Sequence, residues 1–277
     1  MRAPRPAPPD SGWLPGGQGW RLIQGDCGAI LSGLPVGGVD VVVTSPPYNL
    51  DLRYRSYADN RGEAEYLDWL VGICAELRRV LADDGSFFLN IAGSSTQPWL
   101  PFELAVRLRP LFALQNHITW VKSIAANGDA VGHYKPVGGQ RFLNRNHEHL
   151  FHFTRSGRVQ LDRLAIGVPF KDKSNIARRG HARDLRCRGD SWFIPYRTVQ
   201  SRAQKHHHPA PFPQELPQWC IRLHGKPDAL VLDPFAGTGT TLLAARAVGA
   251  RAIGIELDGE YLQVAADLLS QGVTPSG

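Results

Sequence analysis

A short apolar run followed by a glycine-rich turn near the C-terminus constrains the fold of this chain most strongly. The apolar run covers residues 229–232 and ends at Asp233, and the turn reads PFAGTG over residues 234–239. Helical spacing of apolar residues follows over 240–248, and another apolar run covers 252–255. A strand, a tight glycine turn and a helix in this order are typical of a doubly wound α/β fold that binds a nucleotide-like ligand at the turn.

The residues of this turn narrow the choice of ligand. Gly237 and Gly239 allow the backbone to approach a ligand closely, whereas Leu242 stands where a dinucleotide-binding turn has its third glycine. The turn has no Gly-Lys-Ser/Thr sequence, which argues against a nucleoside triphosphate. Glu256 follows the next strand and can accept hydrogen bonds from both ribose hydroxyls of an adenosine ligand. For the glycines alone, a plain turn with positive φ angles is the alternative, but Glu256 and Asp233 favour a ligand.

A second apolar run, residues 39–44, ends in the sequence Ser-Pro-Pro-Tyr at 45–48. A continuous apolar run of this length fits a buried parallel strand. The two prolines have a fixed φ and no N–H group, so the carbonyl oxygens beside them are free to accept hydrogen bonds from a substrate. Ser45 adds a hydroxyl acceptor, and Tyr48 adds a flat ring on which a base can stack with about 1–3 kcal/mol.

These groups suit the amino group of a nucleobase, which has two hydrogens to donate. Ser45 Oγ and the Pro46 carbonyl could each accept one, which would favour a tetrahedral nitrogen and localise its lone pair for in-line attack on a sulfonium methyl group. Catalysis of this kind depends on positioning and electrostatics. Two prolines alone would indicate a plain turn, and the flanking Ser45 and Tyr48 make the motif more specific. Asn49 comes next and either shapes the turn or touches the base.

Strand–helix–strand alternation at both ends of the chain predicts a doubly wound, mostly parallel sheet. In such a sheet the first and fourth strands are neighbours, and ligands lie beyond their carboxyl ends. If the strand at 229–232 is the first and the strand at 39–44 the fourth, the two turns share one crevice and the chain is circularly permuted. The strand at 21–26 is then the third, which places Asp26 near the adenine of the ligand. Further predicted elements are helices at 63–81 (closed by Asp84-Gly85), 101–108, 213–223 and 260–269, and strands at 86–91, 117–121 and 150–154.

Basic residues are concentrated in the middle of the chain. From 122 to 205 there are 17 Lys and Arg against 6 Asp and Glu, whereas the rest of the chain has 14 against 19. Periodicity fades over 157–210, which is too long for a plain loop and predicts an inserted or peripheral module. A basic segment on an otherwise acidic chain favours nucleic acid as a partner, with a solvated basic face as the alternative. The densest arginine cluster is expected to contact DNA: Arg178, Arg179, Arg183, Arg186 and Arg188.

The remaining features argue against several other classes of protein. The four cysteines show no pairing pattern, and the histidines at 206–208 have no acidic or cysteine partner nearby, so we expect neither a disulfide framework nor a metal site. Cysteine usage fits a reducing cytoplasm, and no apolar run is long enough to span a membrane. Residues 1–20 are rich in Pro and Gly and predict a disordered tail without a signal peptide. Trp192 and Phe193 are expected in the core.

The order of these motifs resembles that of one known family. An SPPY sequence, then a variable basic region, then DPFAGTGTT is similar to the β class of bacterial DNA amino-methyltransferases of restriction–modification systems, over residues 21–269. The resemblance implies S-adenosylmethionine as cofactor and a Rossmann-like, circularly permuted fold. It implies a catalytic half at 21–122, a target-recognition region at 123–208 that includes strands near 147–154, and a cofactor-binding half at 209–270. The implied catalytic residues are Ser45, Pro46, Pro47 and Tyr48, and the expected cofactor-binding residues are Asp26, Asp233, Phe235, Ala236, Gly237, Gly239, Thr240 and Glu256.

The first residue of the SPPY motif bears on the target base. In this family an Asp there is usual for adenine-N6 enzymes and a Ser is more typical of cytosine-N4 enzymes, so Ser45 favours cytosine N4 and leaves adenine N6 open. The target nitrogen is buried in a duplex, so the base must be flipped out. Duplex DNA is the expected partner; a cognate restriction endonuclease and a monomer or homodimer stay open. The rival classes are an RNA or protein amide methyltransferase, a nicotinamide oxidoreductase and a non-catalytic DNA-binding protein.

Overall fold

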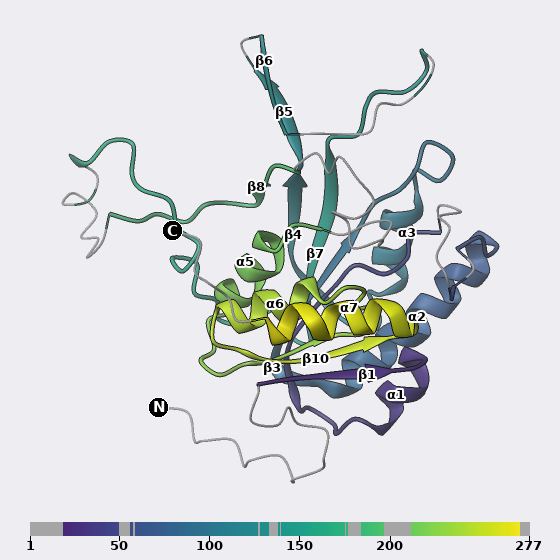
Figure 1. The fold of residues 1–277 in the computed structure, drawn as a ribbon. Coiled ribbons are helices and arrows are strands. Elements are labelled where there is room, and N and C mark those ends of the chain that lie inside the picture. The colour runs from purple at the N-terminus through teal and green to yellow at the C-terminus, as the bar shows by residue number, and fades with distance from the viewer. Residues whose placement is uncertain are drawn as a thin grey trace.

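An eight-stranded sheet forms the centre of the molecule, with the strand order β1-β10-β9-β2-β3-β7-β4-β8 (Figure 1). The computed structural model describes residues 19–49, 56–57, 59–126, 128–132, 138, 140–174, 176, 184–196 and 212–271. Within the sheet β7 runs antiparallel to both of its neighbours, and every other neighbouring pair is parallel. The strands are β1 Trp20–Gln24, β2 Val39–Thr44, β3 Leu81–Ile91, β4 Ala113–Val121, β7 His147–Thr154, β8 Ser191–Phe193, β9 Leu230–Asp233 and β10 Arg251–Glu256.

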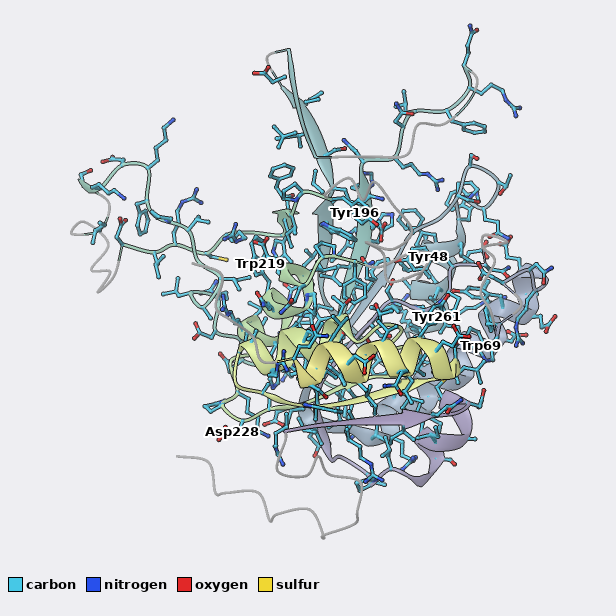
Figure 2. The ribbon with its side chains drawn as sticks, viewed as in Figure 1. Tyr48, Trp69, Tyr196, Trp219, Asp228 and Tyr261 are labelled. Atoms are coloured by element: carbon cyan, nitrogen blue, oxygen red, sulfur yellow. The ribbon has the colours of Figure 1, made fainter. Side chains whose placement is uncertain are left out.

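Helices cover both faces of this sheet, as in a doubly wound fold. The helices are α1 Cys27–Gly33, α2 Glu63–Val80, α3 Leu100–Arg107, α5 Glu215–His224, α6 Thr240–Ala247 and α7 Gly259–Ser270. Helices α1 to α3 pack into one buried apolar cluster and α5 to α7 into a second. Trp69 of α2 packs against the first cluster, and Trp219 of α5 belongs to the second (Figure 2). The predicted α/β fold is therefore confirmed.

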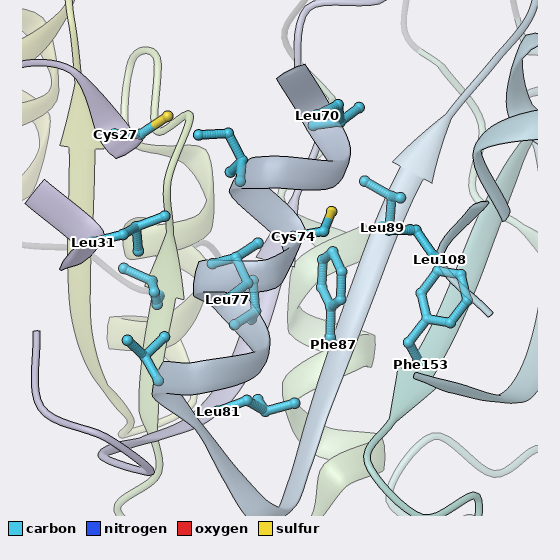
Figure 3. Packing of buried hydrophobic residues seen from close by; sticks show 14 of the residues in the cluster. Cys27, Leu31, Leu70, Cys74, Leu77, Leu81, Phe87, Leu89, Leu108 and Phe153 are labelled. Carbon is cyan, nitrogen blue, oxygen red and sulfur yellow. The ribbon is translucent and has the colours of Figure 1, made fainter. Parts of the chain in front are cut away.

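The sequence of β2 is largely apolar because helices cover both faces of the sheet. All six residues of β2 are buried, and the side chains alternate between the two clusters: Val42 packs in the first, and Val41 and Val43 in the second. In the first cluster, Cys74 and Leu77 of α2 face Phe87 of β3 (Figure 3). A strand that is buried on both faces needs no polar positions, which explains why its sequence shows no alternation.

The topology matches the predicted permutation. Strand β9 pairs with β2 through Val231 opposite Val41 and Leu232 opposite Val42. Strand β1 pairs with β10 at the far edge, as expected of the third topological strand. The carboxyl ends of β2 and β9 therefore meet at one edge of the sheet, although their sequences lie about 190 residues apart.

Several local predictions are wrong. Helix α2 ends at Val80, and the chain continues directly into β3, so Asp84-Gly85 lies within that strand and does not close the helix. The β2–β3 register shifts between Val39 and Val41, and this irregularity accommodates the residues that follow Leu81. The predicted tail, 1–20, ends too late because Trp20 begins β1; residues 1–18 lie outside the described residues.

Four elements have no counterpart in the predictions. Helix α1 is short, and strand β8 has three residues. Strands β5 (Ser123–Ala126) and β6 (Asp129–Gly132) form an antiparallel hairpin that projects beyond the end of β4 (Figure 1). In the part of the chain that the structure describes, no helix is both long and apolar enough to cross a membrane.

A glycine on the strand side replaces the third glycine of a dinucleotide-binding turn. A Cβ atom added at Gly254 of β10 would lie 2.7 Å from Leu242 Cδ1 and 2.9 Å from the Ala236 Cβ atom. In a dinucleotide-binding turn, a glycine in the helix lets the helix and the strand approach closely. Here Gly254 of β10 allows the same approach and leaves room for Leu242 of α6.

A buried polar network ties β3 and β7 to α5. His152 Nε2 lies 3.1 Å from Ser86 Oγ, which lies 3.0 Å from His224 Nδ1, and Asn116 Nδ2 lies 2.9 Å from His152 Nδ1. Burial lowers the pKa of His152 to about 3, helped by the nearby charge of His224. Burial also lowers the pKa of His224. His152 is therefore neutral in the folded protein at neutral and mildly acidic pH.

This network predicts acid sensitivity of the fold. In the unfolded chain a histidine has a pKa near 6.5, so below that pH the unfolded state binds a proton that folded His152 does not bind. Stability is full above about pH 6.5 and falls as the pH decreases toward 3, by at most about 1.4 kcal/mol per pH unit for this residue. We expect the free energy of unfolding, from urea titrations, to drop by about 1 kcal/mol between pH 7.5 and 5.5 on account of His152. The drop should shrink in His152→Gln; an equal drop in that variant would assign the acid sensitivity to other groups.

Candidate active site

The SPPY turn and the glycine turn are joined by a buried hydrogen bond. Thr44, the last residue of β2, donates from Oγ1 to Asp233 Oδ1 at 2.7 Å. Asp233 ends β9, so this bond links the residue before Ser45 to the residue before the glycine turn. Both partners are 1% exposed. The two turns thus form adjoining walls at the carboxyl edge of the sheet.

Asp233 organises the glycine turn from within. Its Oδ1 also accepts a hydrogen bond from Phe235 N at 3.0 Å, and its Oδ2 accepts one from Thr241 Oγ1 at 2.6 Å. Burial raises the pKa of Asp233, while these donors and Thr44 act in the opposite direction. Because the carboxylate is enclosed by donors of the chain, Asp233 fixes the shape of the turn for a ligand that contacts the neighbouring residues.

The glycines of the turn adopt backbone conformations that other residues rarely take. Gly237 has a φ of 52° and Gly239 a φ of 82°, both in the left-handed region. A Cβ atom at Gly239 would also lie 2.9 Å from the Ala265 Cβ atom of α7. Ala236 is buried beside them, and Thr240 begins α6 directly after Gly239. A tight turn at the N-terminus of a helix is therefore built into this stretch.

Glu256, at the end of β10, lies against the glycine turn. Its Oε2 accepts a hydrogen bond from Gly237 N at 2.8 Å and its Oε1 one from Asp258 N at 2.9 Å. Burial raises the pKa of this carboxyl group, and the two backbone donors oppose the rise. Gln24 pairs with Glu256 across β1 and β10, so Asp26 lies at the same edge of the sheet, where its Oδ1 accepts from Ala29 N and caps α1.

These residues fit an adenosine-containing cofactor. A carboxylate oxygen has a second lone pair, so Glu256 can accept from ribose hydroxyls while it holds the backbone of the turn. Gly237, which has a left-handed conformation, lies directly beside Glu256 and has no side chain. Phe235 packs against Trp69 with ring centroids 5.7 Å apart, which gives this wall a rigid apolar part.

The SPPY turn is held from both sides. Ser45 Oγ lies 2.7 Å from Tyr48 OH, and Tyr66 OH of α2 donates to the Pro47 carbonyl at 2.7 Å. The prediction that the carbonyls beside the prolines are free therefore fails for Pro47, whose carbonyl serves to anchor the turn. Asn49 has a φ of 57° and exchanges two 2.8 Å hydrogen bonds with the backbone of Arg61. Of its two predicted roles, the structure shows that Asn49 shapes the turn.

Three side chains that sequence reasoning missed complete the SPPY site. Asn90 of β3 donates from Nδ2 to Tyr48 OH at 2.7 Å and to Glu148 Oε2 at 2.8 Å. Tyr48 OH donates to the same Glu148 Oε2 at 3.0 Å, and Lys122 Nζ pairs with Glu148 Oε1 at 2.9 Å. Burial raises the pKa of Tyr48 well above its usual value, and the charge of Glu148 adds to the rise. The signal in the sequence was a Glu flanked by histidines at 147–149, read only as part of a strand.

The predicted arginine cluster is only partly described. Arg178, Arg179 and Arg183 lie outside the described residues. Arg186 is exposed, and its backbone pairs with Val168. Arg188 donates from Nε to the Ile166 carbonyl at 2.9 Å, and its guanidinium lies 3.8 Å from the ring centroid of Trp219. Arg188 therefore contributes to packing next to the buried Trp192, whose core position was expected; Phe193 is only partly buried.

The hydrogen bond between the two turns gives a direct test of their coupling. Thr44→Val keeps the volume of the side chain and removes the donor to Asp233. Loss of a buried hydrogen bond to a carboxylate typically costs about 1.5–3 kcal/mol, so we expect the free energy of unfolding to fall by that amount and cofactor affinity to fall with it. Thermal unfolding and titration calorimetry measure both; a variant that keeps parental affinity would show that the two walls are not coupled.

Comparisons with known proteins agree with this geometry. The profile of the family described as DNA methylase matches residues 39–267. The chain is 31% identical over 282 residues to the Type II methyltransferase M.XycI of Xanthomonas campestris pv. cyanopsidis, covering 91% of this chain and 88% of that protein. It is 28% identical over 257 residues to the DNA adenine methyltransferase YhdJ of Escherichia coli, covering 90% of this chain and 82% of that protein.

Solved structures show the same fold. The PvuII DNA methyltransferase, described as cytosine-N4-specific, matches with a TM-score of 0.68 at 20% identity and covers 96% of this chain and 92% of that one. A protein described as a DNA modification methylase of Thermus thermophilus, solved with S-adenosyl-L-methionine, matches with a TM-score of 0.62 at 26% identity and covers 92% and 95%.

Fold and site together define a Rossmann-like, S-adenosylmethionine-dependent methyltransferase. The chain belongs to the DNA methylase family and is a DNA amino-methyltransferase of the restriction–modification type.

Proposed function

We propose that this enzyme transfers the methyl group of S-adenosylmethionine to the N4 atom of cytosine in duplex DNA, after the base has been flipped into the crevice between the two turns. The Thr44–Asp233 hydrogen bond is the observation that supports the proposal most directly, because it joins the cofactor wall to the substrate wall. Flipping is required because the amino nitrogen is inaccessible within a stacked duplex. Ser45 in place of Asp at the first position of the motif favours cytosine over adenine.

The residues divide the work between the two walls. Gly237, Gly239 and Glu256 hold the cofactor, which supplies an electrophilic sulfonium methyl group. Tyr48 and Ser45 position the base, and Ser45 Oγ accepts one hydrogen of its amino group. This directs the nitrogen lone pair at the methyl group without a strong general base.

The DNA contacts are assigned by region. The basic segment 123–208 is proposed as the target-recognition region, with its arginines on the phosphates, so DNA binding should weaken steeply with salt. Some of the five clustered arginines are proposed to read guanine edges. A cognate restriction endonuclease is part of the proposal, in keeping with the Type II relatives.

The identity of the methylated base tests the proposal. The protein, S-adenosylmethionine and unmethylated bacterial DNA are incubated, and the DNA is digested to nucleosides and analysed by mass spectrometry. We expect N4-methylcytosine. Adenine N6 is the second candidate, because one relative is named a DNA adenine methyltransferase; N6-methyladenine would select it, and no methylated base would refute both.

A further inference from the structure

We propose that Glu148 is a positioning residue that sets the direction of the hydrogen bonds in the SPPY site and thereby makes Ser45 an acceptor for the amino group of the base. This deepens the proposed function and depends on it. Glu148 lies on β7, about 100 residues from the motif in sequence, and its side chain is 14% exposed. It meets the motif through Tyr48 and Asn90.

The direction of each hydrogen bond follows from counting hydrogens. A carboxylate can only accept, so the Tyr48 hydroxyl must donate its single hydrogen to Glu148 Oε2. Tyr48 then has no hydrogen left for Ser45, and the 2.7 Å contact between their oxygens must be a hydrogen bond from Ser45 to Tyr48. With its own hydrogen directed at Tyr48, Ser45 presents its lone pairs elsewhere.

Asn90 supports the same arrangement. Its Nδ2 has two hydrogens, and its two closest acceptors are Tyr48 OH and Glu148 Oε2, at 2.7 and 2.8 Å. Ser45 Oγ lies farther from Nδ2, at 3.4 Å. The opposite amide orientation would place Oδ1 against the carboxylate of Glu148, which is repulsive, so the orientation is determined. In this orientation the buried Asn90 Oδ1 has no hydrogen-bond partner among the described residues. An unsatisfied buried acceptor is unfavourable, and such groups in native structures are often explained by a functional role.

Lys122 fixes the carboxylate itself. Its ammonium group pairs with Glu148 Oε1 at 2.9 Å, and the Lys122 side chain is 19% exposed. Oε1 is thus engaged by Lys122 and Oε2 by Tyr48 and Asn90, so the carboxylate cannot rotate without losing hydrogen bonds. The result is a chain of donors that runs from Ser45 through Tyr48 to Glu148. It makes Ser45 Oγ an acceptor, as the amino group of the base requires.

Glu148→Gln tests this inference with a nearly isosteric side chain. If the glutamine amide group faces Tyr48, it donates where the carboxylate accepted, and Tyr48 is free to donate to Ser45. If the amide group faces Lys122, two donor groups face each other, which is unfavourable. We expect kcat to fall by about 100-fold, as for removal of one preorganised hydrogen-bonding group. KM for DNA and the Kd for S-adenosylmethionine should stay within about threefold of the parent. Glu103→Gln, on the exposed surface of α3, is the matched control and should leave kcat unchanged.

A binding measurement separates orientation of Ser45 from a general structural effect. The target sequence is first mapped by base-resolved sequencing of methylated DNA. Duplexes are then made in which the target base lacks its amino group, with 2-pyrimidinone for cytosine or purine for adenine. The ratio of the two Kd values reports recognition of the amino group, and Glu148→Gln should reduce that preference. An unchanged ratio together with a parental kcat would overturn the inference.

Tyr48→Phe provides a second variant, because it removes the hydroxyl group that contacts both Glu148 and Ser45. It should lower kcat to a similar extent, and adding Glu148→Gln to it should have little further effect. A parental kcat in Tyr48→Phe would overturn the inference even if Glu148→Gln fails to fold. If the parent protein itself transfers no methyl group to DNA, the proposed function fails, which is a different outcome from a Glu148→Gln variant with parental activity.

Discussion

Ser45→Ala is expected to lower the rate of methyl transfer by about 100- to 1000-fold, while affinity for DNA stays within about threefold of the parent. The serine hydroxyl is small, so its loss removes little contact with the duplex, whose affinity comes mainly from phosphates. The substitution does remove Ser45 Oγ, the acceptor that draws a hydrogen of the amino group out of the plane of the base. Single-turnover transfer of a labelled methyl group measures the rate, and fluorescence anisotropy with S-adenosylhomocysteine present measures the affinity.

Two further variants serve as a control and as a second test of the SPPY turn. Ser32→Ala, on the exposed side of α1, removes a hydroxyl outside the crevice and should change neither quantity. Tyr48→Ala should harm both, since the ring that stacks on the base is lost along with the hydroxyl that orients Ser45, and base stacking contributes about 1–3 kcal/mol. Parental rates in both Ser45→Ala and Tyr48→Ala would show that the SPPY turn is not the site of transfer.

The pairing of the two motifs could be predicted because both follow short, fully buried parallel strands. The run Val39–Thr44 and the run Leu230–Asp233 carry no polar alternation, which is typical of strands covered by helices on both faces. Doubly wound topology then has few solutions, and the one with these strands as neighbours brings the two turns together. General rules of chain topology were therefore enough to predict that the SPPY turn and the glycine turn lie side by side.

The partners of Tyr48 could not be predicted in the same way. Glu148 reaches Tyr48 because β7 inserts antiparallel between β3 and β4, with Asn90 opposite Leu150. No local pattern in the sequence specifies which strand inserts there, or with which register. The sequence predicted only that Asn90 and Glu148 lie in strands, at 86–91 and near 147–154. Their roles emerge only from tertiary pairing, where a shift of one residue would turn Glu148 to the other face of the sheet.

Close packing was also invisible in the sequence. Leu242 stands where a dinucleotide-binding turn has its third glycine, and this argued against a dinucleotide site. The structure shows that Gly254 of β10 provides the space for the Leu242 side chain. The hydrogen bonds of Asp233 were equally invisible: the carboxylate of this residue, which is predicted to bind the cofactor, accepts from Thr44, Phe235 and Thr241. Motif matching identifies which residues matter, but hydrogen-bond geometry is needed to separate those that can contact a ligand from those that hold the turn.

Glu256→Ala should weaken the binding of S-adenosylmethionine by about 100-fold, since hydrogen bonds to a charged acceptor contribute about 1.5–3 kcal/mol each. The carboxylate has two tasks that the variant removes together. It holds Gly237 N and Asp258 N at 2.8 and 2.9 Å, and its remaining lone pairs are available to ribose hydroxyls. The free energy of unfolding should fall by about 1–3 kcal/mol, because Gly237 and Asp258 are buried and their backbone donors lose an acceptor.

The comparison that isolates the ribose contact uses Glu260→Ala, which removes a nearby exposed carboxylate from the first turn of α7. Titration calorimetry should give parental affinity for that variant and a much weaker affinity for Glu256→Ala. A shorter ligand sharpens the assignment: methionine alone, which has no ribose, should show no difference between Glu256→Ala and the parent. If Glu256→Ala binds S-adenosylmethionine as tightly as the parent, the cofactor does not lie along the β10 edge of the glycine turn. The two-walled crevice would then have to be assigned to another ligand.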